Sequence, residues 1–413
     1  MDVYFKSKLR LFILSLPIFF LLFSGIHPVH CANKEGLAQR EFIYHVPEKT
    51  KDGWETSSLN EEDVDPTKIN ELILYIQNGK YKNIHSVILI KNGKLILDEY
   101  FQGYGREKVH EIRSATKSIG SVLTGIAIDH NFLDGVNDKI YPHFKTYKLK
   151  NKWNKRAKDV TLKTLLTMTS GYKCDDHKTN FECETNMYKS DDWVRYALNL
   201  PMAYKPGEHW AYNSSSLILV GEIISKASKK TIPDFANRCL FEPLGIKDFQ
   251  WGFSPKRKAW LAGNAKMKPR DMAKVGFMML NGGKWGNKQI VSQKWINEST
   301  RAYEITNNGA GYGYLWWIGK TVINNHKIKT FWAAGNGGNY IFVLSKLDLV
   351  VVFTGGNYNS LLEAQVFGML INHIIPAVLP SPPRKFIKLD DMVLEGYVGK
   401  YKTKTDEYIF SVY

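Results

Sequence analysis

The chain has 413 residues, of which 44% are hydrophobic and 23% charged, as in a globular protein with a sizeable core. This length corresponds to one large domain or two. The formal net charge is +16, but the basic residues are spread along the chain, without zinc-finger spacing or an RNA-binding aromatic signature. We therefore expect no nucleic-acid partner and a basic surface suited to association with an anionic cell envelope.

The N-terminus has the pattern of an export signal, which we predict at residues 1–32. The apolar run at 11–23 is too short to span a membrane comfortably. Cleavage is expected after Cys31 or Ala32, and an uncleaved membrane anchor is the alternative. We expect an exported protein, periplasmic or secreted. The basic residues that precede the apolar run are Lys6, Lys8 and Arg10.

A helix and a hairpin are predicted after a polar, irregular segment at residues 33–64. Asp65-Pro66 is typical of a helix start, and apolar residues then recur at helical spacing. Two apolar runs, 87–90 and 95–97, flank Asn92-Gly93, a preferred two-residue hairpin turn. The apolar helix positions are Ile69, Leu72, Ile73 and Ile76.

Ser114-Ala115-Thr116-Lys117 opens the next predicted helix. Residues three apart share a helix face, so the Lys117 ammonium can reach the Ser114 hydroxyl, as an activated serine nucleophile requires. The alternative is a helix-capping serine followed by a solvated lysine. Ser170-Gly171-Tyr172-Lys173 repeats the spacing, but its glycine and the following acidic residues indicate a loop.

Helices and long loops are predicted from about 135 to 310, followed by three strands and a helix near 361–375. We predict an α+β fold, in which an antiparallel sheet is flanked by helices and carries an inserted helical lobe. The domain is expected at 65–378, with a proline-rich linker and a short C-terminal appendage at 379–413. The three strands are predicted at 331–334, 340–344 and 349–353.

Three cysteines remain after export, which permits disulfides. Cys174 and Cys183 lie close together in a polar loop, and we expect them to pair. A metal site formed by Cys174, His177 and Cys183 is the alternative. Cys239 is expected in the core.

Several motifs together resemble serine hydrolases related to class C β-lactamases and penicillin-binding proteins, over roughly residues 65–375. Their esterase and 6-aminohexanoate-dimer hydrolase branches share the glycine-rich stretch near residue 337. The resemblance implies a β-lactamase/transpeptidase-like fold. Besides Ser114 to Lys117, the motifs are Leu165–Gly171, Pro206–Ser214, Phe241–Ile246, Pro269–Met272 and Gly311–Trp317.

The resemblance also implies roles for individual residues. Ser114 is the nucleophile that forms an acyl-enzyme, and Lys117 accepts its proton. Tyr212 is the base that later protonates the leaving group. No cofactor and no metal are expected, and His110 and His209 are interpreted as structural.

Two motifs depart from the family pattern. The second reads Tyr212-Asn213-Ser214, in which Ser214 can hydrogen-bond a substrate carbonyl or Lys117. The third lacks its cation, which argues against strong β-lactamase activity. Its glycines suit an oxyanion hole. The substrate and oxyanion candidates on this strand are Asn336, Gly337 and Gly338.

The sequence predicts an exported serine hydrolase that cleaves an ester or amide of a small molecule or peptide. A weak β-lactamase or D-Ala-D-Ala carboxypeptidase is the alternative within the same chemistry. A binding or sensing module that acylates without turnover is the alternative outside it. The sequence does not specify the substrate or the oligomeric state.

Overall fold

The computed structural model describes residues 42–147, 155–178, 181–323 and 326–379, and the backbone of 399–402 and 409–412. The chain forms two units, residues 1–379 and 380–413. In the second, β13 (Gly399–Lys402) pairs antiparallel with β14 (Ile409–Val412). The predicted signal peptide and the proline-rich linker lie outside the described residues.

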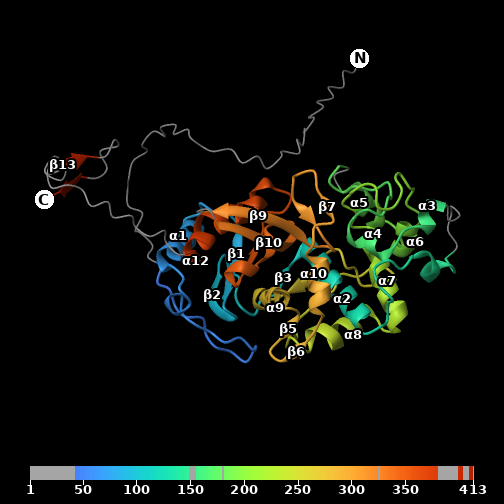
Figure 1. Ribbon diagram of the computed structural model, residues 1–413, viewed down its shortest axis with the longest axis horizontal. Helices are drawn as coiled ribbons and strands as arrows, with labels where there is room; N and C mark the ends of the chain where they lie inside the picture. The colour runs from blue at the N-terminus through green and yellow to red at the C-terminus, as the bar shows by residue number, and fades with distance from the viewer. Residues whose placement is uncertain are drawn as a thin grey trace, which may run out of the picture. The chain divides into compact units, whose positions relative to one another are not determined.

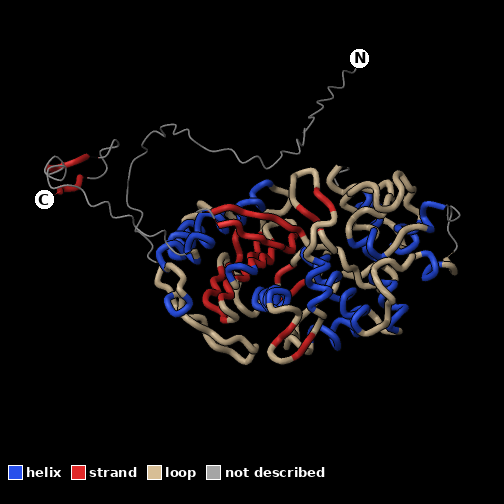
Figure 2. Tube along the Cα trace, viewed as in Figure 1, coloured by secondary structure: helices blue, strands red, loops and turns tan. Residues whose placement is uncertain are grey.

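An eight-stranded antiparallel sheet organises the first unit (Figures 1 and 2). Its strand order is β2-β1-β12-β11-β10-β9-β8-β7, so the strands from the two ends of the domain meet where β1 pairs with β12. The strands are β1 (Ile84–Lys91), β2 (Lys94–Tyr100), β7 (Glu304–Ile305), β8 (Gly311–Tyr312), β9 (Trp317–Ile323), β10 (His326–Gly335), β11 (Asn339–Leu344) and β12 (Leu349–Gly355).

The predicted hairpin is β1 and β2, joined at Asn92 and Gly93. Both turn residues have positive φ, 50° and 79°, the conformation that Asn-Gly favours in a two-residue turn. Alternate residues of β1 point to opposite faces and enter different cores. Ile88 joins one apolar cluster and Val87 the other. Because helices cover both faces, β1 is buried along almost its whole length, whereas β2 is buried only in its first half.

Helices α2 (Thr116–Asp129) and α9 (Pro269–Leu280) pack on one face of the sheet. α9 crosses β1, β11 and β12 closely, since a Cβ on Gly276 would lie 2.6 Å from Val350 and 2.7 Å from Ile341. The other face carries α1 (Pro66–Gln77), α11 (Gln365–Met369) and α12 (Ile375–Val378). Pro66 occupies the first turn of α1, and the Asp65 side chain caps it, as the sequence indicates.

In chain order a helical lobe follows β3 (His110–Glu111) and α2, and Figure 1 shows it beside the sheet, at the right of the view. Helix α7 of the lobe packs against α2. The apolar residues of the lobe belong to the same core cluster as those on this face of the sheet. The α+β prediction is thus confirmed. The helices of the lobe are α3 (Lys155–Lys158), α4 (Leu162–Leu166), α5 (Glu182–Tyr188), α6 (Trp193–Leu198), α7 (Leu217–Ser228) and α8 (Ile232–Ala236).

Three strands of the main sheet were not predicted from the sequence. β7 and β8 have two residues each, and β9, which pairs with β10 and β8, has partly buried residues alternating with exposed ones in its second half. Short two-stranded pairs also join β3 to β4 (Lys266–Met267) and β5 (Lys284–Trp285) to β6 (Lys288–Gln289). Helix α10 (Gln293–Ser299) follows the second pair.

The helical run Leu361–Val378 is long and apolar enough to cross a membrane by length and composition alone. Several of its residues belong to the apolar cluster under the sheet, together with α1. This packing buries 39% of the run and accounts for that part of its apolar character.

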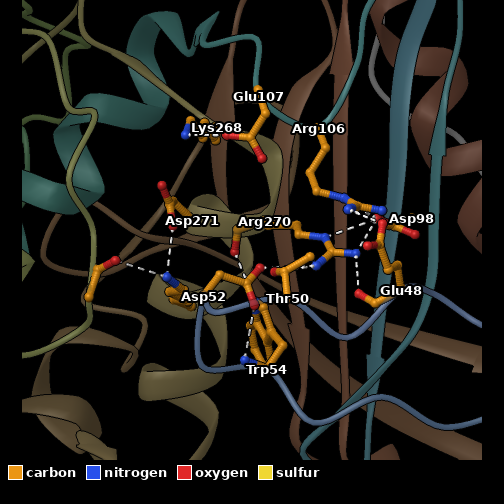
Figure 3. A network of polar contacts seen from close by, with 12 residues as sticks. Glu48, Thr50, Asp52, Trp54, Asp98, Arg106, Glu107, Lys268, Arg270 and Asp271 are labelled. Carbon is orange, nitrogen blue, oxygen red and sulfur yellow. Dashed lines mark hydrogen bonds and ion pairs between the residues drawn. The ribbon is translucent and has the colours of Figure 1, made fainter.

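A network of charges attaches the segment before α1 to α9 (Figure 3). The Arg270 guanidinium donates to Asp98 Oδ2 from Nε at 2.9 Å and to Asp52 Oδ2 from Nη1 at 3.0 Å. It also donates to Thr50 Oγ1 and to the Glu48 carbonyl. The Arg270 side chain is 3% exposed, so these partners replace the water that a buried charge loses.

Candidate active site

Ser114 and Lys117 meet at the start of α2. Ser114 lies in the 3-10 turn η2 (Arg113–Ala115), and the α-helix begins two residues later at Thr116. Lys117 Nζ donates to Ser114 Oγ at 2.8 Å and to the Ala262 carbonyl at 2.9 Å. Lys117 is 2% exposed. The serine hydroxyl therefore accepts from the lysine and does not cap the helix.

The competing Ser170 and Lys173 pair lies outside any helix. Gly171 between them has a φ of +80°, and a Cβ there would lie 2.5 Å from the Tyr204 carbonyl oxygen. Lys173 is exposed. The left-handed glycine prevents the helical turn that brings residues three apart together.

Arg113, just before the serine, has a left-handed backbone with φ +51°. Such a conformation is uncommon for a residue with a side chain and persists where surrounding contacts hold it. Its guanidinium pairs with Glu111 at 3.0 Å and lies 4.7 Å from the centroid of the Tyr358 ring. This turn directs Ser114 into the pocket that Arg113 also lines.

Tyr212 lies beside Lys117, as the predicted roles require. The Lys117 Nζ atom is 4.8 Å from the centroid of the Tyr212 ring, which is 4% exposed. The exposed His177 ring stacks on Tyr212, with centroids 4.5 Å apart and planes 10° apart. Trp317 stacks on Tyr212 less closely, at 6.1 Å. The structure thus brings together the three residues predicted to be catalytic.

The end of β10 reaches the serine through a residue not predicted to be in the site. A Cβ on Gly335 would lie 2.1 Å from the Ile112 carbonyl oxygen and 3.2 Å from the Ala115 nitrogen, so only glycine allows this approach. The next residue, Asn336, lines the pocket. The backbone N–H groups of Ser114 and Asn336 are thus the better candidates for an oxyanion hole.

The other two oxyanion candidates point elsewhere. Gly337 N–H donates to Glu363 Oε2 at 2.9 Å. A Cβ on Gly338 would face Val366 and the Glu363 carbonyl, on the α11 side of the strand. Neither glycine lines the pocket. Their positive φ values, 97° and 93°, instead form the tight turn from β10 to β11.

Ser214 is buried behind Tyr212, and its predicted contact with a substrate carbonyl does not fit this position. It is 0% exposed and is not among the residues that line the pocket. Its backbone N–H donates to Asp176 Oδ2 at 2.7 Å. The Asp176 N–H in turn donates to the Tyr212 carbonyl at 2.7 Å. The sequence analysis did not select Asp176.

Cys174 and Cys183 form a disulfide, with Cα atoms 5.9 Å apart, around the segment that carries Asp176 and His177. The alternative metal site was predicted to use His177 together with the two cysteines. Without the disulfide, Cys174, Asp176 and Cys183 could offer ligand atoms to a metal, whereas the His177 ring stacks on Tyr212. Cys239 is a free cysteine. It is partly buried and packs against the core cluster, whereas the sequence predicts a position inside the core.

The two histidines that the sequence analysis interprets as structural, His110 and His209, each contact another ring. His110 is 2% exposed and shares a 2.7 Å hydrogen bond with His85. The desolvated pair cannot readily charge, and burial lowers the pKa of His85 to about 4. His209 packs on the Tyr204 ring, with centroids 4.2 Å apart.

A pocket of about 600 Å³ opens above Ser114. Its walls include the aromatic side chains of Trp260, Trp317 and Trp332. Two carboxylates, Glu184 and Glu363, also line it, and burial raises the pKa of Glu363. Among the described residues that line the pocket, the only Lys or Arg is Arg113, which is already paired with Glu111.

The antiparallel sheet with an inserted helical lobe and a Ser-x-x-Lys turn at its edge defines the β-lactamase/transpeptidase fold. The Beta-lactamase family model matches residues 85–359, so the chain belongs to the Beta-lactamase family. Members of this fold family include esterases and amidases.

Solved structures with this fold are distant in sequence. A penicillin-binding protein homologue from Pyrococcus abyssi is 19% identical, with a TM-score of 0.56 and coverage of 84% of each chain. A family VIII carboxylesterase is 17% identical, with a TM-score of 0.58 over 75% of this chain and 97% of that one. At these identities the likeness shows the fold alone.

Protein flp from Staphylococcus aureus strain MW2 is 29% identical over 177 residues, or 39% of this chain. The match covers 33% of that protein, so this chain spans about a third of the length of such curated relatives.

Proposed function

We propose that the protein is an exported serine hydrolase that cleaves an ester or amide through an acyl-enzyme on Ser114. The observation that carries this proposal is the 2.8 Å contact between Lys117 Nζ and Ser114 Oγ at the floor of the pocket. At this distance the unprotonated amine of Lys117 can take the serine proton as Ser114 attacks.

In the proposed reaction, the Ser114 oxygen attacks the substrate carbonyl carbon while its proton passes to Lys117. The N–H groups of Ser114 and Asn336 stabilise the developing oxyanion. Tyr212, beside Lys117, protonates the leaving group as the carbonyl re-forms and the acyl-enzyme remains. Water then enters and releases the acid by the same steps in reverse order.

The pocket supports substrates without a carboxylate near the bond that is cleaved. Glu184 and Glu363 repel anions, and Arg113 is engaged by Glu111. The aromatic walls favour an apolar or positively charged group. We therefore propose an ester or amide substrate in preference to penicillins or peptides that end in D-Ala-D-Ala.

Export is part of the same proposal. The pattern at residues 1–32 motivates it, and the Cys174–Cys183 disulfide supports it, because such bonds persist in oxidising compartments. N-terminal sequencing of protein recovered from fractionated cells tests it. Recovery of an intact Met1 terminus in the cytoplasm would contradict it.

The first experiment is the intact mass of the protein after treatment with a fluorophosphonate. Wild type should gain one adduct, and Ser114→Ala none. Ser170→Ala is the matched control, because Ser170 has the same spacing to a lysine, and it should label like wild type. Labelling of Ser114→Ala, or no labelling of wild type, would overturn the proposal.

Turnover separates a hydrolase from a module that only acylates. Wild type should hydrolyse 4-nitrophenyl butyrate steadily, at a rate lost in Ser114→Ala. A burst of one nitrophenol per protein without further release would assign the site to a non-turnover module.

A further inference from the structure

The segment closed by the disulfide holds Tyr212 from two sides. From within the lobe, the Asp176 N–H donates to the Tyr212 carbonyl at 2.7 Å. From the pocket, the His177 ring stacks on the phenol. Two consecutive residues of one loop thus fix both the backbone and the ring of the predicted base.

The Asp176 carboxylate is buried against the catalytic residues with incomplete pairing. Asp176 is 0% exposed, and Oδ2 accepts from the Ser214 N–H at 2.7 Å. Among the described residues, Asp176 Oδ1 has no well-aligned hydrogen-bond partner, and the Ser214 hydroxyl lies close enough to lower the pKa of the carboxyl but is not aligned with it. A buried carboxylate held only for structure would normally have both oxygens paired.

The charges that face Asp176 come from the surrounding helices. Burial raises the pKa of Asp176 to about 6, and Glu184 on α5 adds to this. Ser214 and the Lys117 ammonium on α2 act in the opposite direction. Burial raises the pKa of Tyr196 on α6, and the charges of Asp176 and Glu182 add to this. Lys117 and Asp176 therefore interact electrostatically.

We propose that Asp176 is a positioning residue for acylation, which holds Tyr212 in place and provides the negative charge that stabilises Lys117 when Lys117 takes the Ser114 proton. This inference rests on the proposed function and extends it to a residue outside the Ser-x-x-Lys and Tyr motifs. Asp176 does not touch the substrate, because it does not line the pocket.

The proton balance of the step leaves Asp176 unchanged. The Ser114 O–H bond breaks, an N–H bond forms on Lys117, and the Ser114 oxygen forms a bond to the acyl carbon. The new ammonium and the ionised Asp176 carboxylate attract each other in a buried site where water screens poorly. When Tyr212 relays the proton to the leaving group, Lys117 is neutral again.

The test is the pH dependence of acylation by 4-nitrophenyl butyrate between pH 4.5 and 8.5. Wild-type kcat/KM should rise through an ionisation near pH 6 as Asp176 loses its proton. In Asp176→Asn this rise should be absent. The rate at pH 8 should fall about 10- to 100-fold, because the neutral amide no longer attracts the ammonium that forms on Lys117 in this step.

Two further variants make the test specific. Asp175→Asn removes the same charge one residue away and should keep the wild-type profile. Ser214→Ala removes a hydroxyl that lowers the pKa of Asp176, so the rise should move to higher pH. Hydrolysis by Ser114→Ala is subtracted as background.

The outcomes separate this inference from the proposed function. If wild type is labelled by the fluorophosphonate and Asp176→Asn keeps both the rise near pH 6 and the wild-type rate, the inference is overturned and the proposed function stands. A wild-type rate independent of pH over this range overturns the inference as well. If Ser114 is not labelled at all, the proposed function itself fails.

Discussion

Arg270 and Asp176 are both buried charged side chains, but their surroundings differ. Arg270 donates to two carboxylates, a hydroxyl and a carbonyl, and its neighbours hold the pKa of Asp52 below its usual value despite burial (Figure 3). Asp176 has one unpaired oxygen and a raised pKa. Because Arg270 is fully paired, its charge stabilises the fold. The charge of Asp176 costs stability, and it lies beside the residues proposed to be catalytic.

The largest expected effect is on the rate of acylation, at Lys117, which lies in the same site as Asp176. Lys117→Met keeps the volume of the side chain and removes the base. Acylation of the protein by 4-nitrophenyl butyrate should fall by about 10⁴-fold, or about 5 kcal/mol, as for members of a catalytic unit. Urea unfolding should show a smaller loss of stability than for Arg270→Met, because Lys117 Nζ donates to two uncharged groups, the Ser114 hydroxyl and the Ala262 carbonyl. If the variant unfolds instead, Lys117 is structural in the way that Arg270 is.

Arg270→Met should have the largest effect on stability. It removes the cation paired with Asp52 and one of the two cations paired with Asp98, where Arg106 remains. Removal of one partner of a buried pair costs about 3–5 kcal/mol. Urea unfolding measures this cost, and fluorophosphonate labelling of the folded fraction should be unchanged. Lys68→Ala is the control, because its pair with Glu71 is exposed and is worth under about 1 kcal/mol. Equal losses of stability in Arg270→Met and Lys68→Ala would contradict the difference expected between a buried and an exposed ion pair.

Asp176→Asn should stabilise the protein while it slows acylation. The folded pKa of about 6 lies above the unfolded value, so the native state binds the proton more tightly and stability falls as pH rises from about 4 to 6. Above pH 6 the variant avoids this cost and should be about 2–3 kcal/mol more stable, with no difference at pH 4. A thermal unfolding series against pH provides the check. A destabilised variant at pH 8 would mean that the carboxylate is held for structure.

The smallest expected effect concerns Asp52. Its folded pKa is lowered, so it contributes stability above its unfolded pKa and loses that contribution as pH falls through the folded value. Asp52→Asn should cost about 1–2 kcal/mol at pH 7, and this cost should shrink as pH falls through the lowered folded pKa of Asp52. The pH trend is thus opposite to that of Asp176→Asn. Parallel trends in the two unfolding series would contradict the assignment of opposite pKa shifts.

Local sequence patterns determined much of this protein. The Asn92-Gly93 turn, the Asp65-Pro66 helix start and the apolar runs of β1, β11 and β12 each reflect preferences over a few residues. The pairing of Ser114 with Lys117 is local too, because one helical turn brings them together. Strand β9 was missed, since polar residues interrupt its apolar pattern and it gains its partners, β10 and β8, only within the sheet.

Only the tertiary structure decided the surroundings of the nucleophile. Asp175 and Asp176 are chemically the same in the sequence, yet Asp176 is fully buried behind Tyr212 and Asp175 is partly exposed. Likewise, Gly335 faces the serine turn and Gly338 faces α11, although both belong to one glycine-rich stretch. Burial and long-range contacts set these differences, because the free energy of a charge or a close backbone approach depends on what the rest of the chain places around it.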